Sequence, residues 1–163
     1  MKISLSVSLF IVAATSAFAS TKQDLQIIYD KFNSAMMARD IKAWDRLCDT
    51  YYDKDYVSVY LGTPHDRPYL RKQLVTFFGH VTRYKSQKTT LEKISESGPS
   101  VEASLRINIE FNALGPDRKT HLFKGEERLI HSWVHEKRGW ILRKSKSLTM
   151  RATVDGKAFG GSR

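Results

Sequence analysis

The chain has 163 residues, of which 41% are hydrophobic and 27% charged, so it can form one domain with its own core. Its formal net charge is +10, and its single cysteine, Cys48, excludes an internal disulfide. No apolar run reaches the ~20 residues that cross a bilayer, so we expect no membrane-spanning helix.

The first nineteen residues have the pattern of a secretory signal peptide. Lys2 supplies the positive start, Ile3–Ala14 is mostly apolar, and Ala17-Phe18-Ala19 is a small-x-small cleavage signal. We therefore predict a signal peptide over residues 1–19, a mature chain that starts at Ser20, and a secreted or periplasmic location.

Apolar spacing predicts two helices before residue 52. The first covers about residues 21–39, and its apolar face is formed by Leu25, Ile28, Tyr29, Phe32 and Met36. Asp40 is a suitable N-cap for the second, whose apolar stripe contains Ile41, Trp44, Leu47, Cys48 and Tyr51. Because Cys48 lies on this stripe, we expect a buried core cysteine and not a nucleophile.

A short strand and a third helix are expected next. Tyr56–Leu61 is β-branched and aromatic, and Gly62-Thr63-Pro64 ends it. Asp66-Arg67-Pro68 combines a capping aspartate with a proline in the first turn, which is typical of a helix start.

From Lys85 onward the apolar period changes to two, which predicts strands. The clearest is 101–112, and another follows from 120 to 135, in which Gly125 is a candidate position for a bulge. Gly139 suits the turn of a hairpin that leads into a last strand over residues 140–150. The segment 151–163 is glycine-rich at its end, and we expect a flexible tail.

Helices followed by an antiparallel meander predict an α+β fold. The expected architecture is a cone-like, curved antiparallel sheet packed on three helices from the N-terminal half. Residues 20–150 would form this domain, and the space under such a sheet is a place where small ligands bind.

Three segments of the chain together are similar to those of a known family: MMARDIKAWDRLCDTY, YVSVYLGTPHDRPYLRKQL and ERLIHSWVHEKRGWILRKSKS. They resemble the nuclear-transport-factor-2-like superfamily, in its SnoaL-like and ketosteroid-isomerase-like branches. The resemblance covers about residues 21–148. It implies a ligand-binding cone and a homodimer formed through the outer face of the sheet. The superfamily includes isomerases, cyclases, hydratases, binders and non-catalytic modules, so fold alone does not decide activity.

The catalytic residues of the ketosteroid isomerases do not carry over to this chain. Phe32 stands where the resemblance implies a tyrosine, and Tyr60 falls near the position of the general base. Lys144 and Lys146 match positions where many cyclase-like relatives carry a His-x-His pair.

Polar residues on an otherwise apolar strand face are the remaining candidates for a site. If the strand over residues 120–135 has no bulge, Glu127, His131 and Trp133 share one face. Glu127 and His131 would lie roughly 13 Å apart along the strand and could contact two ends of one ligand. We therefore consider Glu127, His131 and Tyr60 as weak catalytic candidates. The predicted ligand-binding residues are Phe32, Trp44, Tyr60, Glu127, His131 and Trp133.

We expect no metal and no cofactor. His131 and His135 are too far apart on a strand to share an ion, and no phosphate loop or nucleotide motif is present. Removing the leader takes away Lys2 and leaves a charge of about +9. This charge favours anionic surfaces, although an exported protein is not expected to meet nucleic acid.

Three functions remain open at this point. The first is an exported protein that binds a small apolar or amphipathic ligand, with no established catalysis. The second is a SnoaL-like cyclase, hydratase or isomerase that uses Glu127, His131 and Tyr60. The third is an interaction module whose basic face contacts an anionic envelope component.

Overall fold

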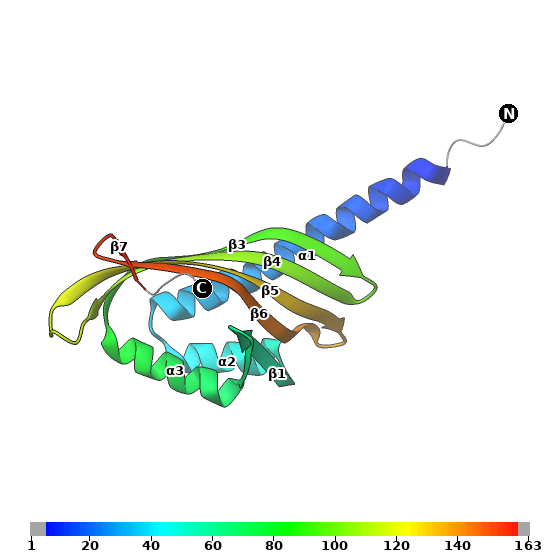
Figure 1. The fold of residues 1–163 in the computed structure, drawn as a ribbon. Coiled ribbons are helices and arrows are strands. Elements are labelled where there is room, and N and C mark those ends of the chain that lie inside the picture. Colours follow the sequence, from blue (N-terminus) through cyan, green and yellow to red (C-terminus); the bar gives the residue numbers. More distant parts are fainter. Residues whose placement is uncertain (1–5, 160–163) are drawn as a thin grey trace.

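Three helices lie on the concave side of a long, curved sheet (Figure 1). The computed structural model describes the backbone of residues 6–159 and the side chains of residues 20–159. The helices are α1 (Ser6–Met37), α2 (Ile41–Tyr51) and α3 (Arg67–His80). The predicted α+β class, with a curved sheet over three helices, is confirmed.

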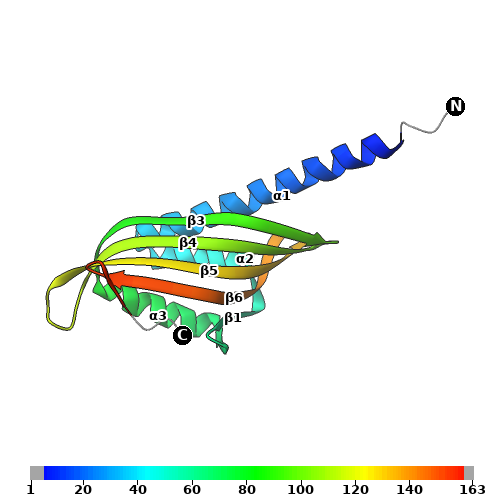
Figure 2. The ribbon, with the colours of Figure 1, turned by 45° about the horizontal axis from the view of Figure 1, so that its top comes forward.

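The first helix begins earlier than the apolar spacing predicted. Helix α1 starts at Ser6, and its N-terminal half extends beyond the sheet (Figures 1 and 2). The predicted signal peptide, residues 1–19, lies outside the residues whose side chains are described, so its cleavage stays a prediction. Within the described part of the chain, no helix has the length and apolar character needed to cross a membrane.

Both predicted helix caps are confirmed. The Asp40 side chain accepts a 2.9 Å hydrogen bond from the backbone N–H of Ala43, and Asp66 accepts one of 2.9 Å from that of Tyr69. Cys48 is fully buried, as expected, and burial raises its pKa to about 12.

The sheet follows the order β2-β1-β6-β5-β4-β3, with β7 paired to β6. The strands are β1 (Tyr52–Tyr60), β2 (Thr63–Asp66), β3 (Val81–Ser97), β4 (Ser100–Leu114), β5 (Thr120–Glu136), β6 (Gly139–Val154) and β7 (Lys157–Ala158). Strands β3 to β6 form the predicted antiparallel meander. Strand β1 pairs with β6 in parallel, so the sheet is mixed and not purely antiparallel.

Two ends of the sheet differ from the sequence prediction. Strand β1 is followed by β2, because Leu61 and Gly62 adopt φ values of 48° and 82° and turn the chain back on itself. Strand β6 continues past Met150 to Val154, where another turn leads into β7. The predicted flexible tail, residues 151–163, therefore begins with residues of the sheet, and its last four residues are outside the described part.

The candidate bulge at Gly125 does not form. Strand β5 pairs with β4 without a break, and Gly125 lies opposite Ile109. A Cβ at Gly125 would lie 3.1 Å from Cγ2 of Ile109, so glycine allows close packing here and does not mark an extra residue. The irregularities between β5 and β6 place the extra residues on β6, at Arg143 and Leu148.

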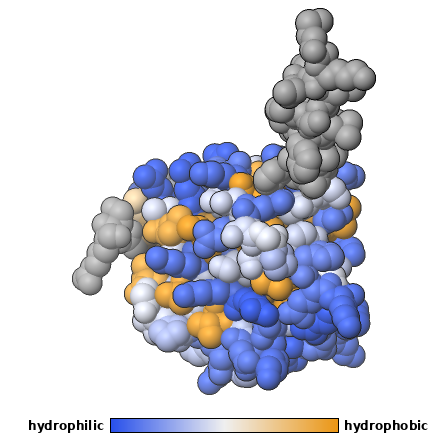
Figure 3. All heavy atoms as spheres, turned by 90° about the vertical axis from the view of Figure 1, so that its right-hand side faces the viewer, coloured by the Kyte–Doolittle hydropathy of each residue, from blue (hydrophilic) through white to orange (hydrophobic). Residues whose placement is uncertain are grey.

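The core lies between α1 and the concave face of the sheet. Leu25 and Ile28 of α1 pack in one cluster with Leu105 of β4 and Trp133 of β5. Hydrophilic side chains cover most of the face in Figure 3, and the apolar ones form small separate patches there. The concave face, and not this side of the molecule, therefore contains the hydrophobic residues that position a site.

Candidate functional site

A cavity of about 230 Å³ lies between α1 and the concave face of the sheet; we call it the inner cavity. Its wall includes side chains of α1, α2 and strands β1, β3, β4, β5 and β6. A second space of about 330 Å³, the outer hollow, shares Met36, Gln87, Ile107 and Glu127 with it. The two spaces are therefore neighbours, with Ile107 and Glu127 between them.

Five of the six predicted ligand-binding residues line the inner cavity. They are Phe32, Trp44, Glu127, His131 and Trp133. The unbroken β4–β5 register explains this, because it keeps residues 127, 131 and 133 on one face of β5. Whether any of them binds a ligand stays a prediction.

Tyr60 does not line the inner cavity. Its side chain lies at the end of β1, is 36% exposed, and donates a 3.0 Å hydrogen bond to Sδ of Met150. Met150 lines the outer hollow, so Tyr60 contacts a residue of that space without lining it. The inner cavity therefore brings together Glu127 and His131 but not Tyr60, the third weak catalytic candidate.

A chain of hydrogen bonds runs from Trp133 to His131 through Tyr29. Nε1 of Trp133 donates to the Tyr29 hydroxyl over 2.8 Å, and that hydroxyl lies 3.2 Å from Nδ1 of His131. An indole N–H can only donate, so the Tyr29 oxygen is an acceptor on that side. We assign its own proton to His131 Nδ1, because His131 is the one further hydrogen-bond partner of this hydroxyl among the described residues. This arrangement leaves the His131 proton on Nε2.

His131 is neutral in this environment. Burial lowers its pKa to about 3, because an imidazolium would lose its hydration without gaining a counter-ion. None of the described groups forms a hydrogen bond with Nε2. His131 therefore presents an uncharged N–H donor on the wall of the inner cavity.

Among the described residues, Glu127 supplies the one carboxyl group on the wall of the inner cavity. Burial raises its pKa, and a hydrogen bond from Ser147 opposes this shift in part. The side chain also borders the outer hollow. A carboxyl group with a raised pKa in a cavity is a candidate acid or base.

Other polar groups on the wall are neutral. Asn33 and Thr89 pair with each other, whereas the buried Oε1 of Gln87 has no hydrogen-bond partner among the described residues. Oδ1 of Asn33 accepts from Thr89 Oγ1 over 2.9 Å and from Gln87 Nε2 over 3.4 Å. These groups fix the shape of the wall without adding charge.

Sequence reasoning missed Tyr29 and Asn33 as residues of the site. Both lie on the apolar stripe of α1, where Tyr29 was assigned to the core from its spacing. Asn33 follows Tyr29 by one helical turn and could have been noticed as a polar residue on a buried face. Gln87 and Thr89 alternate on β3 and gave no comparable signal.

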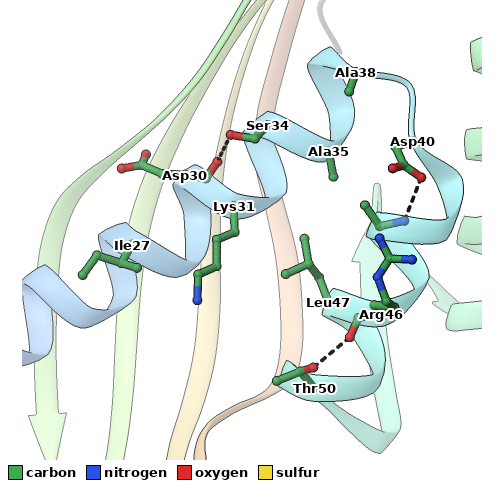
Figure 4. A pocket seen from close by; sticks show the side chains of 11 residues that line it. Ile27, Asp30, Lys31, Ser34, Ala35, Ala38, Asp40, Arg46, Leu47 and Thr50 are labelled. Atoms are coloured by element: carbon green, nitrogen blue, oxygen red, sulfur yellow. Dashed lines mark hydrogen bonds between the residues drawn. The ribbon is translucent and has the colours of Figure 1, made fainter.

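A hollow larger than the inner cavity lies elsewhere. It is an open groove of about 730 Å³ between α1 and α2, on the side of α1 away from the sheet (Figure 4). Alanines and parts of Ile27 and Leu47 form its floor, and Asp30, Lys31 and Arg46 lie along it. No catalytic or metal-binding set of side chains converges there, so the inner cavity is the better candidate site. Among the described residues, no group of His, Cys, Asp or Glu could hold a metal ion.

Comparisons with solved structures identify the fold. A putative scytalone dehydratase from Novosphingobium aromaticivorans is similar with a TM-score of 0.66 and 10% identity, over 91% of this chain and 95% of that one. A hexachlorocyclohexane dehydrochlorinase (LinA) of type 2 gives 0.63 and 13%, over 88% and 95%. An NTF2-like protein from Cytophaga hutchinsonii gives 0.54 and 12%, over 77% and 94%.

The chain therefore has the nuclear-transport-factor-2-like fold, as the sequence resemblance implied. Identities at this level show the fold alone. No protein family model matches the chain, and no curated protein matches it.

Proposed function

We propose that this protein binds a small, partly apolar molecule in the inner cavity. The observation that carries the proposal is the cavity itself, about 230 Å³ between α1 and the sheet, with a wall of aromatic rings and interspersed, mostly neutral polar side chains. This volume lies below the ~300–1,000 Å³ of common ligand pockets, so it suits a ligand of one or two rings. Because Ile107 lies between the two spaces, a longer ligand in the inner cavity could extend past it into the outer hollow.

A cavity-filling variant tests this proposal. Ile107→Phe adds a ring at the boundary of the two spaces, whereas Ile130→Phe adds the same ring on the opposite face of the sheet. Thermal shifts and native mass spectra would be recorded with a panel of uncharged ring compounds, including indane and 1-indanone. We expect binding to the wild-type chain and to Ile130→Phe, and loss of binding in Ile107→Phe. No binding to the wild-type chain, or equal binding to both variants, would contradict the proposal.

Catalysis is the second candidate, and Glu127 is the observation that favours it. Two of the similar structures are described as a putative dehydratase and a dehydrochlorinase, both of which eliminate across a C–C bond. In this reading the Glu127 carboxylate removes a proton from the ligand as general base. The structure offers no second charged group on the cavity wall, so binding without turnover stays our first proposal.

The variant Glu127→Gln separates these two functions. Proton abstraction would appear as deuterium uptake from D₂O into the CH₂ beside the carbonyl of 1-indanone, followed by NMR. If Glu127 is a base, the substitution abolishes uptake and leaves the melting temperature at pH 7 unchanged or higher, because ionising this buried carboxyl opposes folding. Uptake that is absent in the wild-type chain, or persists in the variant, rejects the catalytic reading.

We further infer export, a homodimer formed through the outer face of the sheet, and contact with anionic surfaces. The leader over residues 1–19 supports export, and the exposed Lys144 and Lys146 on β6 support anionic contact. Size-exclusion chromatography at rising ionic strength tests both kinds of association. Contacts with an anionic surface should weaken as salt screens the charge, whereas a dimer held by apolar contacts should persist.

A further inference from the structure

The inner cavity carries almost no charge, although the whole chain is strongly basic. Among the described residues its wall holds no lysine, arginine or aspartate. Its histidine is neutral, and burial raises the pKa of its one carboxyl group, Glu127, which disfavours the charged form. A ligand carboxylate or phosphate would have no cation to pair with there, and burying an unpaired ion is costly. The wall therefore favours an uncharged ligand.

The same wall presents one donor that is fixed by other side chains. Trp133 donates to Tyr29, and Tyr29 donates to Nδ1 of His131, so the free proton of the imidazole is held on Nε2. The rings of these three residues also contact one another, with centroids 5.6 Å apart for Tyr29 and His131 and 5.9 Å apart for Tyr29 and Trp133. The imidazole is thus held by a hydrogen bond at Nδ1 and by ring contacts with Tyr29 and Trp133.

We infer that Tyr29 is a positioning residue that makes His131 Nε2–H a permanent donor, and that the cavity selects uncharged ring compounds with an acceptor oxygen. This inference rests on the proposed function of the inner cavity. A ketone, ether or hydroxyl oxygen of the ligand would accept the proton of Nε2–H. Without such an oxygen the donor stays unpaired, which costs free energy in a buried site.

Matched ligands test the selectivity. The series is 1-indanone, indane, indane-1-carboxylate and 1-aminoindane, which share a ring system and differ in oxygen and charge. We expect 1-indanone to bind about tenfold more tightly than indane, which is the size expected for one buried neutral hydrogen bond. The carboxylate and the ammonium compound should bind more weakly than indane. Equal binding of 1-indanone and indane, or tighter binding of a charged member, overturns the inference.

Variants test the role of Tyr29. Tyr29→Phe removes the hydroxyl between Trp133 and His131, and Tyr84→Phe is a matched control because the Tyr84 hydroxyl is buried without a partner in the described part of the chain. Imidazole ¹⁵N chemical shifts of His131 report its tautomer. If Tyr29 had a purely structural role, Tyr29→Phe would not change that tautomer. We expect the Nε2–H form in the wild-type chain and in Tyr84→Phe, and a mixture in Tyr29→Phe together with loss of the tenfold preference.

The outcomes separate this inference from the proposed function. If indane and 1-indanone both bind equally and Ile107→Phe abolishes both, the cavity binds ligands but the inference about His131 is wrong. A preference for 1-indanone that survives in Tyr29→Phe with an unchanged tautomer also overturns the positioning role. If no member of the series binds, the proposed function fails, and the inference fails with it.

Discussion

At the scale of single residues, burial decides what His131 and Glu127 can do. Burial lowers the pKa of His131 to about 3 and raises that of Glu127, so the charged form is disfavoured in both. The sequence predicted that these two residues share a face, because a strand without a bulge keeps their parity. It could not predict that His131 would be a donor, because that property comes from Tyr29, which is distant in the sequence.

His131 should make stability depend on pH in a defined direction. Its folded pKa is about 3 and its unfolded pKa about 6.5, so between these values the unfolded chain binds the additional proton. The free energy of unfolding should therefore fall as pH decreases from about 6.5 toward 3, by up to about 1.4 kcal/mol per pH unit from this group.

Urea unfolding of the wild-type chain and of His131→Gln, at several pH values from 4 to 7, measures this contribution. Other titrating groups affect both proteins, so the difference between the two curves isolates His131. We expect this difference to be largest at pH 7 and to shrink as the pH falls. Parallel curves would show that His131 is protonated in the folded chain and would contradict its role as a neutral donor.

At the scale of elements, local signals predicted where helices begin and where hairpins turn. Asp40 and Asp66 cap the second and third helices through side-chain hydrogen bonds, and Gly139 has the positive φ, 104°, that the last hairpin requires. The parallel pairing of β1 with β6 had no local signal, because it joins segments that are far apart in the sequence. The extra residues at Arg143 and Leu148 are not glycines, so nothing in their type marked them.

The β4–β5 loop and the β6–β7 turn are joined by one histidine. Nδ1 of His121 lies 2.6 Å from Oδ2 of Asp155, and its Nε2 lies 2.9 Å from Oδ1 of Asp117. These hydrogen bonds raise the pKa of His121 and lower those of both aspartates. Only the charged imidazolium can donate from both nitrogens at once.

This contact should stabilise the chain in a limited pH window. A raised histidine pKa gives stability that is present below about pH 6.5 and is lost as pH rises through the folded pKa. Lowered aspartate pKa values give stability that is lost as pH falls below about 4. His121→Asn should therefore lower the melting temperature more at pH 5.5 than at pH 8.5.

Gly115→Ala provides an independent check, because its Cβ would lie 2.7 Å from Cδ2 of His121 and displace the ring. We expect it to reproduce the pH dependence of His121→Asn. Equal destabilisation by His121→Asn at both pH values would show that the charge of the imidazole does not contribute.

At the scale of the whole molecule, the sheet and α1 enclose the inner cavity, in which we propose that the ligand binds. The order of elements predicted a cone, and the comparisons with solved structures agree with that fold. The polar groups of the inner cavity come from α1 and from strands β1, β3, β5 and β6, which meet only in the folded chain. The sequence therefore predicted the fold that encloses the inner cavity better than the arrangement of polar groups on the cavity wall.

The larger groove between α1 and α2 is the main alternative binding site for a ligand. The most direct test therefore determines whether the ligand occupies the inner cavity or this groove. Methyl and amide NMR spectra would be recorded while 1-indanone is added to the wild-type chain. We predict shift changes at Ile107, Leu129 and the His131 ring, and none at Ile27 and Leu47 in the groove. Chemical-shift changes confined to Ile27 and Leu47, or no changes at a saturating concentration of 1-indanone, would contradict binding in the inner cavity.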